Sequence, residues 1–233
     1  MPVIITGNNT PTAGGVTYGD GSTYANTVAG SAGGVLYSAG SSAPAFSAAG
    51  SSGQVLQTNG TGAPSWVTPA GGLTLGTPVA TINSGTSFDF TGIPAGTKQI
   101  IISIQDVKRS GTQPPSFKIG DSGGVESAGY AVTGAAIISG TSASESVTSG
   151  FIIKSGDASH RFNGSITLTL INATNNTWAA TGSWADVQGG PPYNNFFSTA
   201  GAKSLTGVLD RVSLTTVSGG DGYTQGEINI AYQ

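Results

Sequence analysis

The last two thirds of the chain alternate apolar and polar side chains with a period of two residues. Residues 100–104, 166–171 and 228–233 show the alternation most clearly, and Gly, Pro, Asn and Asp cluster between such segments. Because successive side chains of a strand point to opposite faces of a sheet, this pattern predicts antiparallel strands with one buried face. Asp89 lies between two phenylalanines, so we expect its carboxylate to point outward.

Further strands are predicted in five segments that combine β-branched and aromatic residues with flanking turn formers. Roughly eight to ten strands without a helical pattern favour a jelly-roll-like antiparallel β-sandwich over a small barrel. We place this all-β domain at residues 73–233, and the pattern leaves its strand order open. The five further segments are residues 117–119, 130–138, 147–154, 177–186 and 205–217.

The first third of the chain contains a repeat with a period of about twenty residues. Residues 30–36 (GSAGGVL) and 50–56 (GSSGQVL) begin two copies, and each copy continues through Gly and Ala-Pro to an aromatic residue, Phe46 or Trp66. Residues 14–21 weakly match a further copy. A flexible Gly/Ser linker has a similar composition, but stacked units explain why Val-Leu and the aromatic recur at the same phase. We therefore predict an extended stalk at residues 29–72.

One repeat contains too little apolar surface to be ordered alone. Each large side chain contributes about 1.5–3 kcal/mol when fully buried, whereas ordering costs more than about 1 kcal/mol per residue. We therefore expect symmetric association of several chains, which buries area that a thin segment lacks. The composition changes at residues 69–76, where we place the boundary between the stalk and the sandwich.

Composition excludes several classes of function. Charged residues make up only 8% of the chain and the formal net charge is −3, which argues against binding to a phosphate backbone. The absence of cysteine excludes disulfides, thiolate metal sites and thiol nucleophiles. The sequence has neither an apolar run long enough for a membrane helix nor a recognisable secretion signal.

The sequence does not predict an enzyme, a metal site or a cofactor. His160 is the only histidine and lies in a polar segment, so we expect it to be exposed in a loop. None of the 11 carboxylates forms a recognisable catalytic pair. Asp121 precedes Ser-Gly-Gly, which is typical of a turn rather than a calcium loop.

Two segments are candidates for receptor binding. Residues 184–197 combine aromatics with amides, groups that commonly hold sugars, and the candidates there are Trp184, Tyr193, Asn194 and Asn195. Alternatively, Trp184 and the two phenylalanines at 196 and 197 fill the core of the sandwich or the axis of a trimer. The second segment is a predicted exposed loop at residues 108–115, where Lys108 and Arg109 are candidates for contact with acidic surface sugars.

Several stretches resemble bacteriophage tail fibre proteins. Residues 53–66 (GQVLQTNGTGAPSW) resemble the G-Q-V-L-x-x-N-G-x-G-A-P-x-W unit that recurs in phage and prophage fibres. Residues 86–100 are similar to the first strand and turn of fibre knob domains, residues 119–124 to their I-G-D-S-G-G segment, and residues 226–232 to their closing strand. The resemblance covers most of residues 30–233, in islands. It implies a homotrimer in the virion, with a particle-attachment segment, here residues 1–28, and a distal knob.

The expected function is therefore host adsorption. We expect the knob to bind a glycan, lipopolysaccharide or outer-membrane component on a bacterial host, while the N-terminal segment contacts other virion proteins. The alternative is a purely structural virion component, such as a head fibre, decoration protein or baseplate connector, without a receptor. No nucleic acid partner and no membrane insertion are expected.

Overall fold

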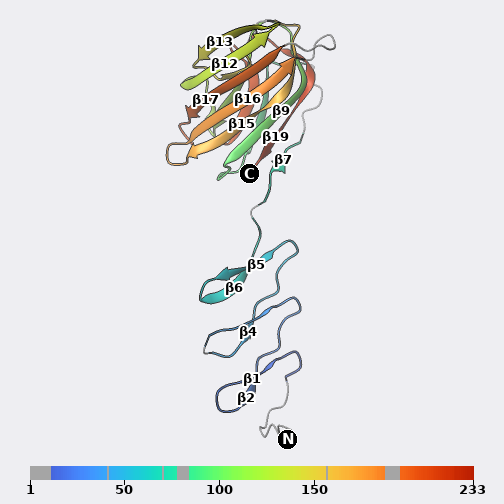
Figure 1. The fold of residues 1–233 in the computed structure, drawn as a ribbon, viewed down its shortest axis with the longest axis vertical. Coiled ribbons are helices and arrows are strands. Elements are labelled where there is room, and N and C mark those ends of the chain that lie inside the picture. Colours follow the sequence, from blue (N-terminus) through green and yellow to red (C-terminus); the bar gives the residue numbers. More distant parts are fainter. Residues whose placement is uncertain (1–11, 41, 70, 78–83, 156, 187–194) are drawn as a thin grey trace. The chain divides into compact units, whose positions relative to one another are not determined.

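The computed structural model divides the chain into two compact units, Met1–Gly71 and Gly72–Gln233 (Figure 1). This division falls inside the segment where the composition changes. The structure describes residues 12–40, 42–69, 71–77, 84–155, 157–186 and 195–233. Every regular element in these ranges is a β-strand, which confirms the all-β prediction. The same ranges contain no helix that could cross a membrane.

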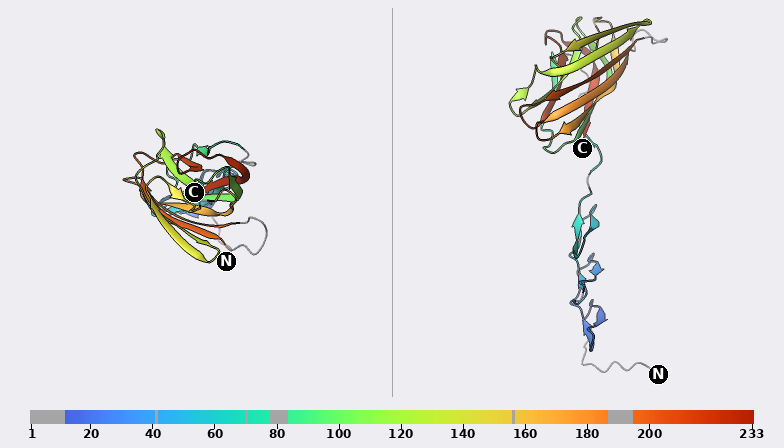
Figure 2. Two further views of the ribbon diagram at one scale, coloured as in Figure 1. Left: turned by 90° about the horizontal axis from the view of Figure 1, so that it is seen from above. Right: turned by 60° about the vertical axis from the view of Figure 1, so that its left-hand side comes forward.

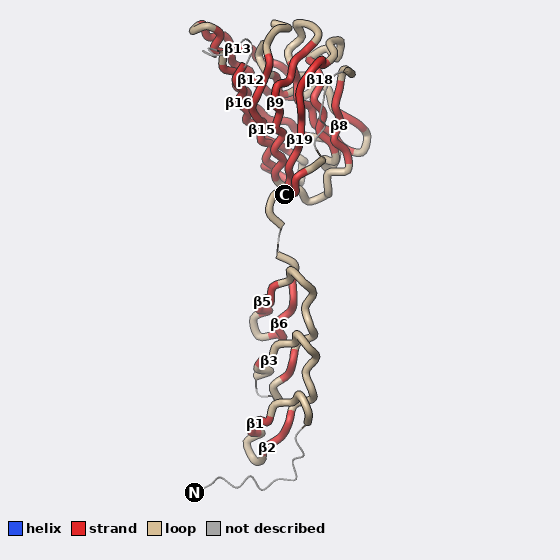
Figure 3. Tube along the Cα trace, turned by 90° about the vertical axis from the view of Figure 1, so that its right-hand side faces the viewer, coloured by secondary structure: helices blue, strands red, loops and turns tan. Residues whose placement is uncertain are grey.

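Unit 1 consists of three short antiparallel hairpins (Figures 1 and 3). In each hairpin, a tight turn precedes the first strand, and the backbone amide that ends this turn donates to the carbonyl three residues earlier. Each turn also contains a glycine with positive φ, at residues 14, 33 and 53. Glycine recurs there because it is the residue that adopts positive φ without steric cost. The hairpins are β1 (Thr17–Gly19) with β2 (Tyr24–Asn26), β3 (Leu36–Tyr37) with β4 (Ala45–Phe46), and β5 (Val55–Asn59) with β6 (Gly62–Val67).

The weak match at residues 14–21 is therefore a third copy of the repeat. Its turn matches the other two, with Gly15 donating to Thr12 as Gly34 donates to Ser31. This copy lies within residues 1–28, the segment predicted to attach to the particle.

The aromatic residue of each later repeat packs on the glycine that begins the same repeat. The Phe46 ring lies against Gly30 and the Trp66 ring against Gly50, where an added Cβ would come within 2.7 and 2.5 Å of the ring atoms. The Trp66 indole nitrogen also donates to the carbonyl of Ala48, at 2.7 Å. These contacts tie each later hairpin to the segment that precedes it, and they explain why glycine and the aromatic recur at one phase of the repeat.

Unit 2 consists of two antiparallel sheets that face each other (Figures 2 and 3). The larger sheet has the order β13-β12-β17-β16-β15-β9-β19-β7, and the smaller has the order β11-β10-β18-β8, with β14 also paired to β10. The strands of the larger sheet are β13 (Thr141–Val147), β12 (Tyr130–Ile138), β17 (Phe196–Ser204), β16 (Thr177–Asp186), β15 (Arg161–Asn172), β9 (Gln99–Arg109), β19 (Tyr223–Tyr232) and β7 (Thr74–Leu75). Those of the smaller sheet are β11 (Gly124–Val125), β10 (Pro115–Asp121), β18 (Arg211–Thr216), β8 (Ser87–Thr91) and β14 (Phe151–Ile152).

The core of unit 2 lies between the two sheets and follows the predicted alternation. Ile100, Ile102 and Ile104 point inward from β9, as expected from their spacing. Across the core, the ring of Phe117 in the smaller sheet stacks on Trp184 in the larger, with centroids 5.6 Å apart. Asp89 is exposed, which confirms the expectation for that carboxylate. The connection order of a jelly roll stays a prediction.

Two predicted strands differ from the structure. The segment at 147–154 contains only the end of β13 and the two residues of β14, and the segment at 205–217 begins its strand only at Arg211. Residues 205–210 have no sheet ladder: the amides of Leu205 and Asp210 donate to single backbone carbonyls, and side chains hold the residues between them. The Thr206 amide and hydroxyl donate to Glu126 Oε1, at 2.8 and 2.9 Å, so no partner strand is needed.

Candidate binding groove on the larger sheet

The middle of β9 contains a β-bulge that both neighbouring strands share. Gln105 and Asp106 together face a single residue of β15, Asn163, and Asp106 and Val107 together face only Gly226 of β19. Asp106 is thus the extra residue on both sides, and its φ of 55° is unusual for a residue other than glycine. Bulges of this kind redirect side chains and are frequent beside functional sites.

Polar contacts from both neighbouring strands, β15 and β19, fix the bulge. The Asp106 amide donates to Asn163 Oδ1 at 3.0 Å. The Asp106 carboxylate accepts two bonds from Arg161, each 2.5 Å long, and one from the Gln225 amide. The bonds from Arg161 hold the pKa of Asp106 below its ordinary value. A left-handed conformation outside glycine costs about 1–3 kcal/mol, so the surrounding contacts must stabilise it.

A shallow polar groove opens on the outer face of the sheet above this bulge. It consists of two adjoining cavities of about 330 and 480 Å³ that share Gln105 and Glu227. We call it the β9–β19 groove and define it by its polar lining: Ser103, Gln105, Asp106, Asn163, Thr224, Gln225, Glu227 and Asn229.

The groove retains hydrogen-bonding groups that the described part of the chain does not use. The side chains of Gln105 and Glu227 are exposed and make no hydrogen bond to other described residues. Asn163 uses its carbonyl oxygen on Asp106, and Gln225 uses its amide nitrogen there, so one end of each amide stays available. The groove therefore offers both donors and acceptors to a polar ligand.

A second opening on the same sheet has a different character. It measures about 300 Å³ and lies over β12, β13 and β17. Ile137 and Phe196 line it, and each is 46% exposed. The opening is mainly apolar, and Phe196 is therefore not the core residue that one of the sequence-based alternatives expected.

Trp184 is not available to a receptor. It is 1% exposed and packs in the core against Phe117, so its prediction as a binding residue is wrong and the core alternative is confirmed. Tyr193 and Asn194 lie outside the described residues. Asn195 is half-buried, and its amide bonds to Asp186 and to the backbone of Ser139. It holds protein groups together rather than facing solvent freely.

Lys108 and Arg109 lie in strand β9 rather than in an exposed loop. Arg109 is 1% exposed, its guanidinium lies 5.3 Å from the centroid of the Phe162 ring, and it donates to the carbonyl of Asp157. Burial lowers the pKa of Arg109, and the side chain does not face an acidic sugar. Lys108 is half-buried and pairs with Arg161 in the sheet register, at the edge of the groove. The predicted pair of exposed cations is therefore wrong.

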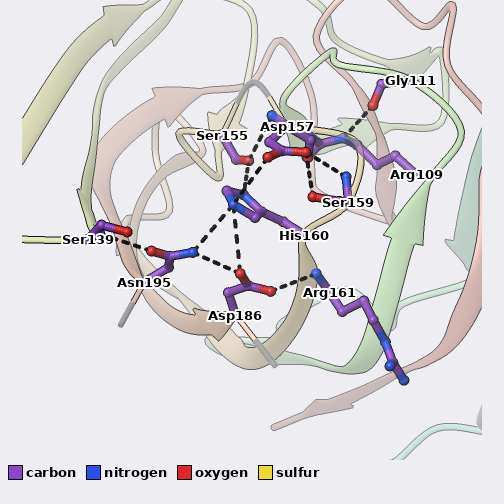
Figure 4. A network of polar contacts seen from close by, with 10 residues as sticks. All are labelled: Arg109, Gly111, Ser139, Ser155, Asp157, Ser159, His160, Arg161, Asp186 and Asn195. Atoms are coloured by element: carbon purple, nitrogen blue, oxygen red, sulfur yellow. Dashed lines mark hydrogen bonds and ion pairs between the residues drawn. The ribbon is translucent and has the colours of Figure 1, made fainter. Parts of the chain in front are cut away.

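His160 is buried at 5% exposure, contrary to the expectation of an exposed loop (Figure 4). Its Nδ1 lies 2.7 Å from the Ser155 hydroxyl, and its Nε2 lies 3.4 Å from the Asn195 amide nitrogen and 3.7 Å from an Asp186 oxygen. This set contains the residue types of a catalytic relay, but the distance to Asp186 is too long for a hydrogen bond and Ser155 is itself buried. The cluster packs the end of the core, where the imidazole contacts the ring of Phe197.

Sequence patterns missed the groove because its residues come from three strands far apart in the chain. The bond from the Asp106 amide to Asn163 spans 57 positions, and the bond from the Gln225 side chain to Asp106 spans 119. One local signal was available. Gly226 interrupts the otherwise regular final strand, and an isolated glycine in a strand often marks a bulge.

Comparisons with protein-family models, curated proteins and solved structures found no match.

Within the described ranges, no group of His, Asp and Glu side chains is arranged to hold a metal ion. The turn predicted at Asp121 is confirmed, because its Oδ1 accepts the amide of Gly123 at 2.8 Å. The β9–β19 groove is the polar surface feature that best suits a ligand.

Proposed function

We propose that the chain is a fibre protein of a bacteriophage particle, in which three copies associate through unit 1 and unit 2 adsorbs to a glycan or outer-membrane component of the host. The observation that carries this proposal is the repeated exposure of apolar residues in unit 1. Val35 and Leu36 are 37% and 42% exposed, and Val55 and Leu56, at the same phase of the next repeat, are 49% and 38% exposed.

These exposed residues favour association between copies. Each hairpin has very few buried side chains, and among the described residues of unit 1 only Thr27 is buried. Burying a valine or leucine completely contributes about 1.5–3 kcal/mol, and the same apolar pair recurs along the chain. A second and third copy that cover this row would supply the burial that one chain lacks. This supports a trimeric stalk, as does the resemblance of residues 53–66 to fibre repeats.

Unit 2 suits adsorption through several weak contacts. It has a closed core, and the described openings on its larger sheet are shallow. Shallow sites bind weakly one at a time, but three linked copies raise the overall affinity because the later contacts form within one assembly. A jelly-roll-like knob at the end of a trimer would present its sites in this way.

The test uses the purified full chain on an array of bacterial lipopolysaccharides and capsular polysaccharides. We expect saturable binding of the assembled chain to at least one member of the array. The double variant Leu36→Ser, Leu56→Ser is the matched control, and it should bind at least about tenfold more weakly because it loses the multivalent contacts. If the assembled wild-type chain binds no member, host adsorption is wrong and the structural virion component replaces it.

A further inference from the structure

We infer that the β9–β19 groove binds a neutral saccharide, and that an interior unit of a linear polysaccharide lies in it. This inference rests on the proposed function, because it names the site and the ligand class through which adsorption takes place. It concerns a part of unit 2 whose ligand-binding role no sequence pattern indicates.

The unused groups of the groove match the hydrogen-bonding pattern of a sugar. Each hydroxyl of a saccharide donates one hydrogen bond and accepts others, so neighbouring hydroxyls need donors and acceptors side by side. Gln105 supplies both, and the free ends of Asn163 and Gln225 add one donor and one acceptor. Glu227 adds an acceptor. A partner protein surface would instead require a central apolar anchor, which the polar lining of the groove does not match.

The charges around the groove favour a neutral ligand. Asp106 and Arg161 neutralise each other through their paired bonds. Glu227 is exposed and has no cationic partner among the described residues, whereas Lys108 is half-buried at the edge. An acidic sugar placed in the groove would bring its carboxylate or phosphate close to Glu227, while the Arg161 guanidinium there is already paired with Asp106 and offsets this repulsion little.

The groove is preorganised by the bulge. Asp106 is held in place by Asn163, Arg161 and Gln225 before any ligand arrives. A ligand therefore does not need to order the backbone of the site, which lowers the entropic cost of binding. The unfavourable φ of Asp106 is thus explained by its role in shaping the binding site.

The surface beside the groove leaves room for a longer chain. Ser103 in the groove pairs across strands with Ser165, which pairs with Ser183, and Ser183 in turn pairs with Ser198. Cross-strand neighbours share a face, so this row of small side chains lies on the same outer face as the groove. A saccharide that leaves the groove in this direction meets no bulky side chain in the row, which suits an interior unit better than a chain end.

The test compares neutral and acidic bacterial polysaccharides on one array, using the full chain. Gln105→Ala should weaken binding to neutral members about five- to tenfold, because it removes a donor and an acceptor that contact the ligand. Glu227→Gln should gain binding to acidic members, because it removes the carboxylate that repels them and keeps an acceptor oxygen at the same place. Thr169→Ala changes an exposed residue of β15 away from the groove and should leave binding unchanged. Shortened fragments that end within the groove should bind more weakly than longer chains.

Separate outcomes distinguish the two proposals. If the wild-type chain binds no polysaccharide, the proposed function itself fails. If the wild-type chain binds but Gln105→Ala binds neutral members equally well, or Glu227→Gln gains no acidic member, only the assignment of the groove fails. Preferential binding of the wild-type chain to acidic members would overturn the ligand class. If Gln105→Ala changes the oligomeric mass instead of saccharide binding, the groove is an interface between copies and the inference is wrong.

Discussion

Gly226 is the residue of β19 that faces the bulge, and its replacement by alanine should destabilise unit 2 strongly. Its φ of +124° is a conformation that residues other than glycine rarely adopt. An added Cβ would lie 2.6 Å from the Cα of Val107 and 2.9 Å from the carbonyl oxygen of Asp106. Because both atoms belong to the backbone of the adjacent strand, no rotation of a side chain relieves the contact.

The expected magnitude follows from these two effects. The unfavourable φ costs about 1–3 kcal/mol, and overpacking against a fixed backbone costs a further 1–3 kcal/mol or so. Together they amount to about 2–6 kcal/mol, a large part of the total stability of about 5–15 kcal/mol that is typical of a domain. For a domain of this size, the melting temperature should fall by roughly 5–20 °C.

Differential scanning calorimetry of the full chain measures this change. Gly220→Ala is the matched control, since its added Cβ would meet only the Ser218 hydroxyl, at an ordinary contact distance of 3.6 Å. We expect the control to differ from the wild-type chain by less than about 0.5 kcal/mol. A Gly226→Ala variant that melts within about 2 °C of the control would refute the tight, glycine-dependent bulge.

Three further substitutions test other contacts. Asp106→Asn should lower stability at neutral pH, and the difference from the wild-type chain should disappear in acid. The pKa of Asp106 in the folded chain is depressed, so the carboxylate stabilises the fold above its ordinary pKa of 3.8, and this stabilisation is lost as the pH falls through the folded pKa. Urea unfolding across this pH range measures the difference. Tyr130→Phe should cost about 1–3 kcal/mol in urea unfolding, because the buried hydroxyl accepts the backbone amide of Ile119 at 2.9 Å. Gly50→Ala should displace the ring of Trp66, seen as a shift of indole fluorescence to longer wavelength.

Each of these substitutions has a control in the same unit. Asp89→Asn changes an exposed carboxylate of β8, and an equal loss of stability there would show that the Asp106 effect is unspecific. Tyr232→Phe should be nearly neutral, so equal costs for both tyrosines would contradict the role of the buried hydroxyl. Gly19→Ala places its Cβ in open space and should leave the fluorescence unchanged; a matching shift would contradict the packing of the ring on glycine.

Local patterns predicted those parts of the fold that depend on local geometry. The alternation at residues 100–104 identifies the buried face of β9, because the period of a strand fixes which side chains share a face. The twenty-residue repeat likewise predicted ordered units, since the recurrent glycine and aromatic contact each other within one repeat. Residues 130–138 and 177–186 match β12 and β16.

Residues whose surroundings come from distant strands were not predictable in this way. Arg109 and His160 have polar side chains that suggest exposure, but both are buried by partners from other segments. Residue type alone gives the average exposure of an amino acid, whereas burial depends on which strands become neighbours. The groove depends on the same information, because Asp106 is a bulge only relative to β15 and β19.

Sedimentation equilibrium of the purified full chain tests the central proposal most directly, because adsorption by a fibre requires the association that unit 1 supports. We predict a single species with three times the chain mass of 22.9 kDa, which dissociates when Leu36 and Leu56 are both replaced by serine. A wild-type chain that remains at 22.9 kDa at every concentration would contradict the proposal.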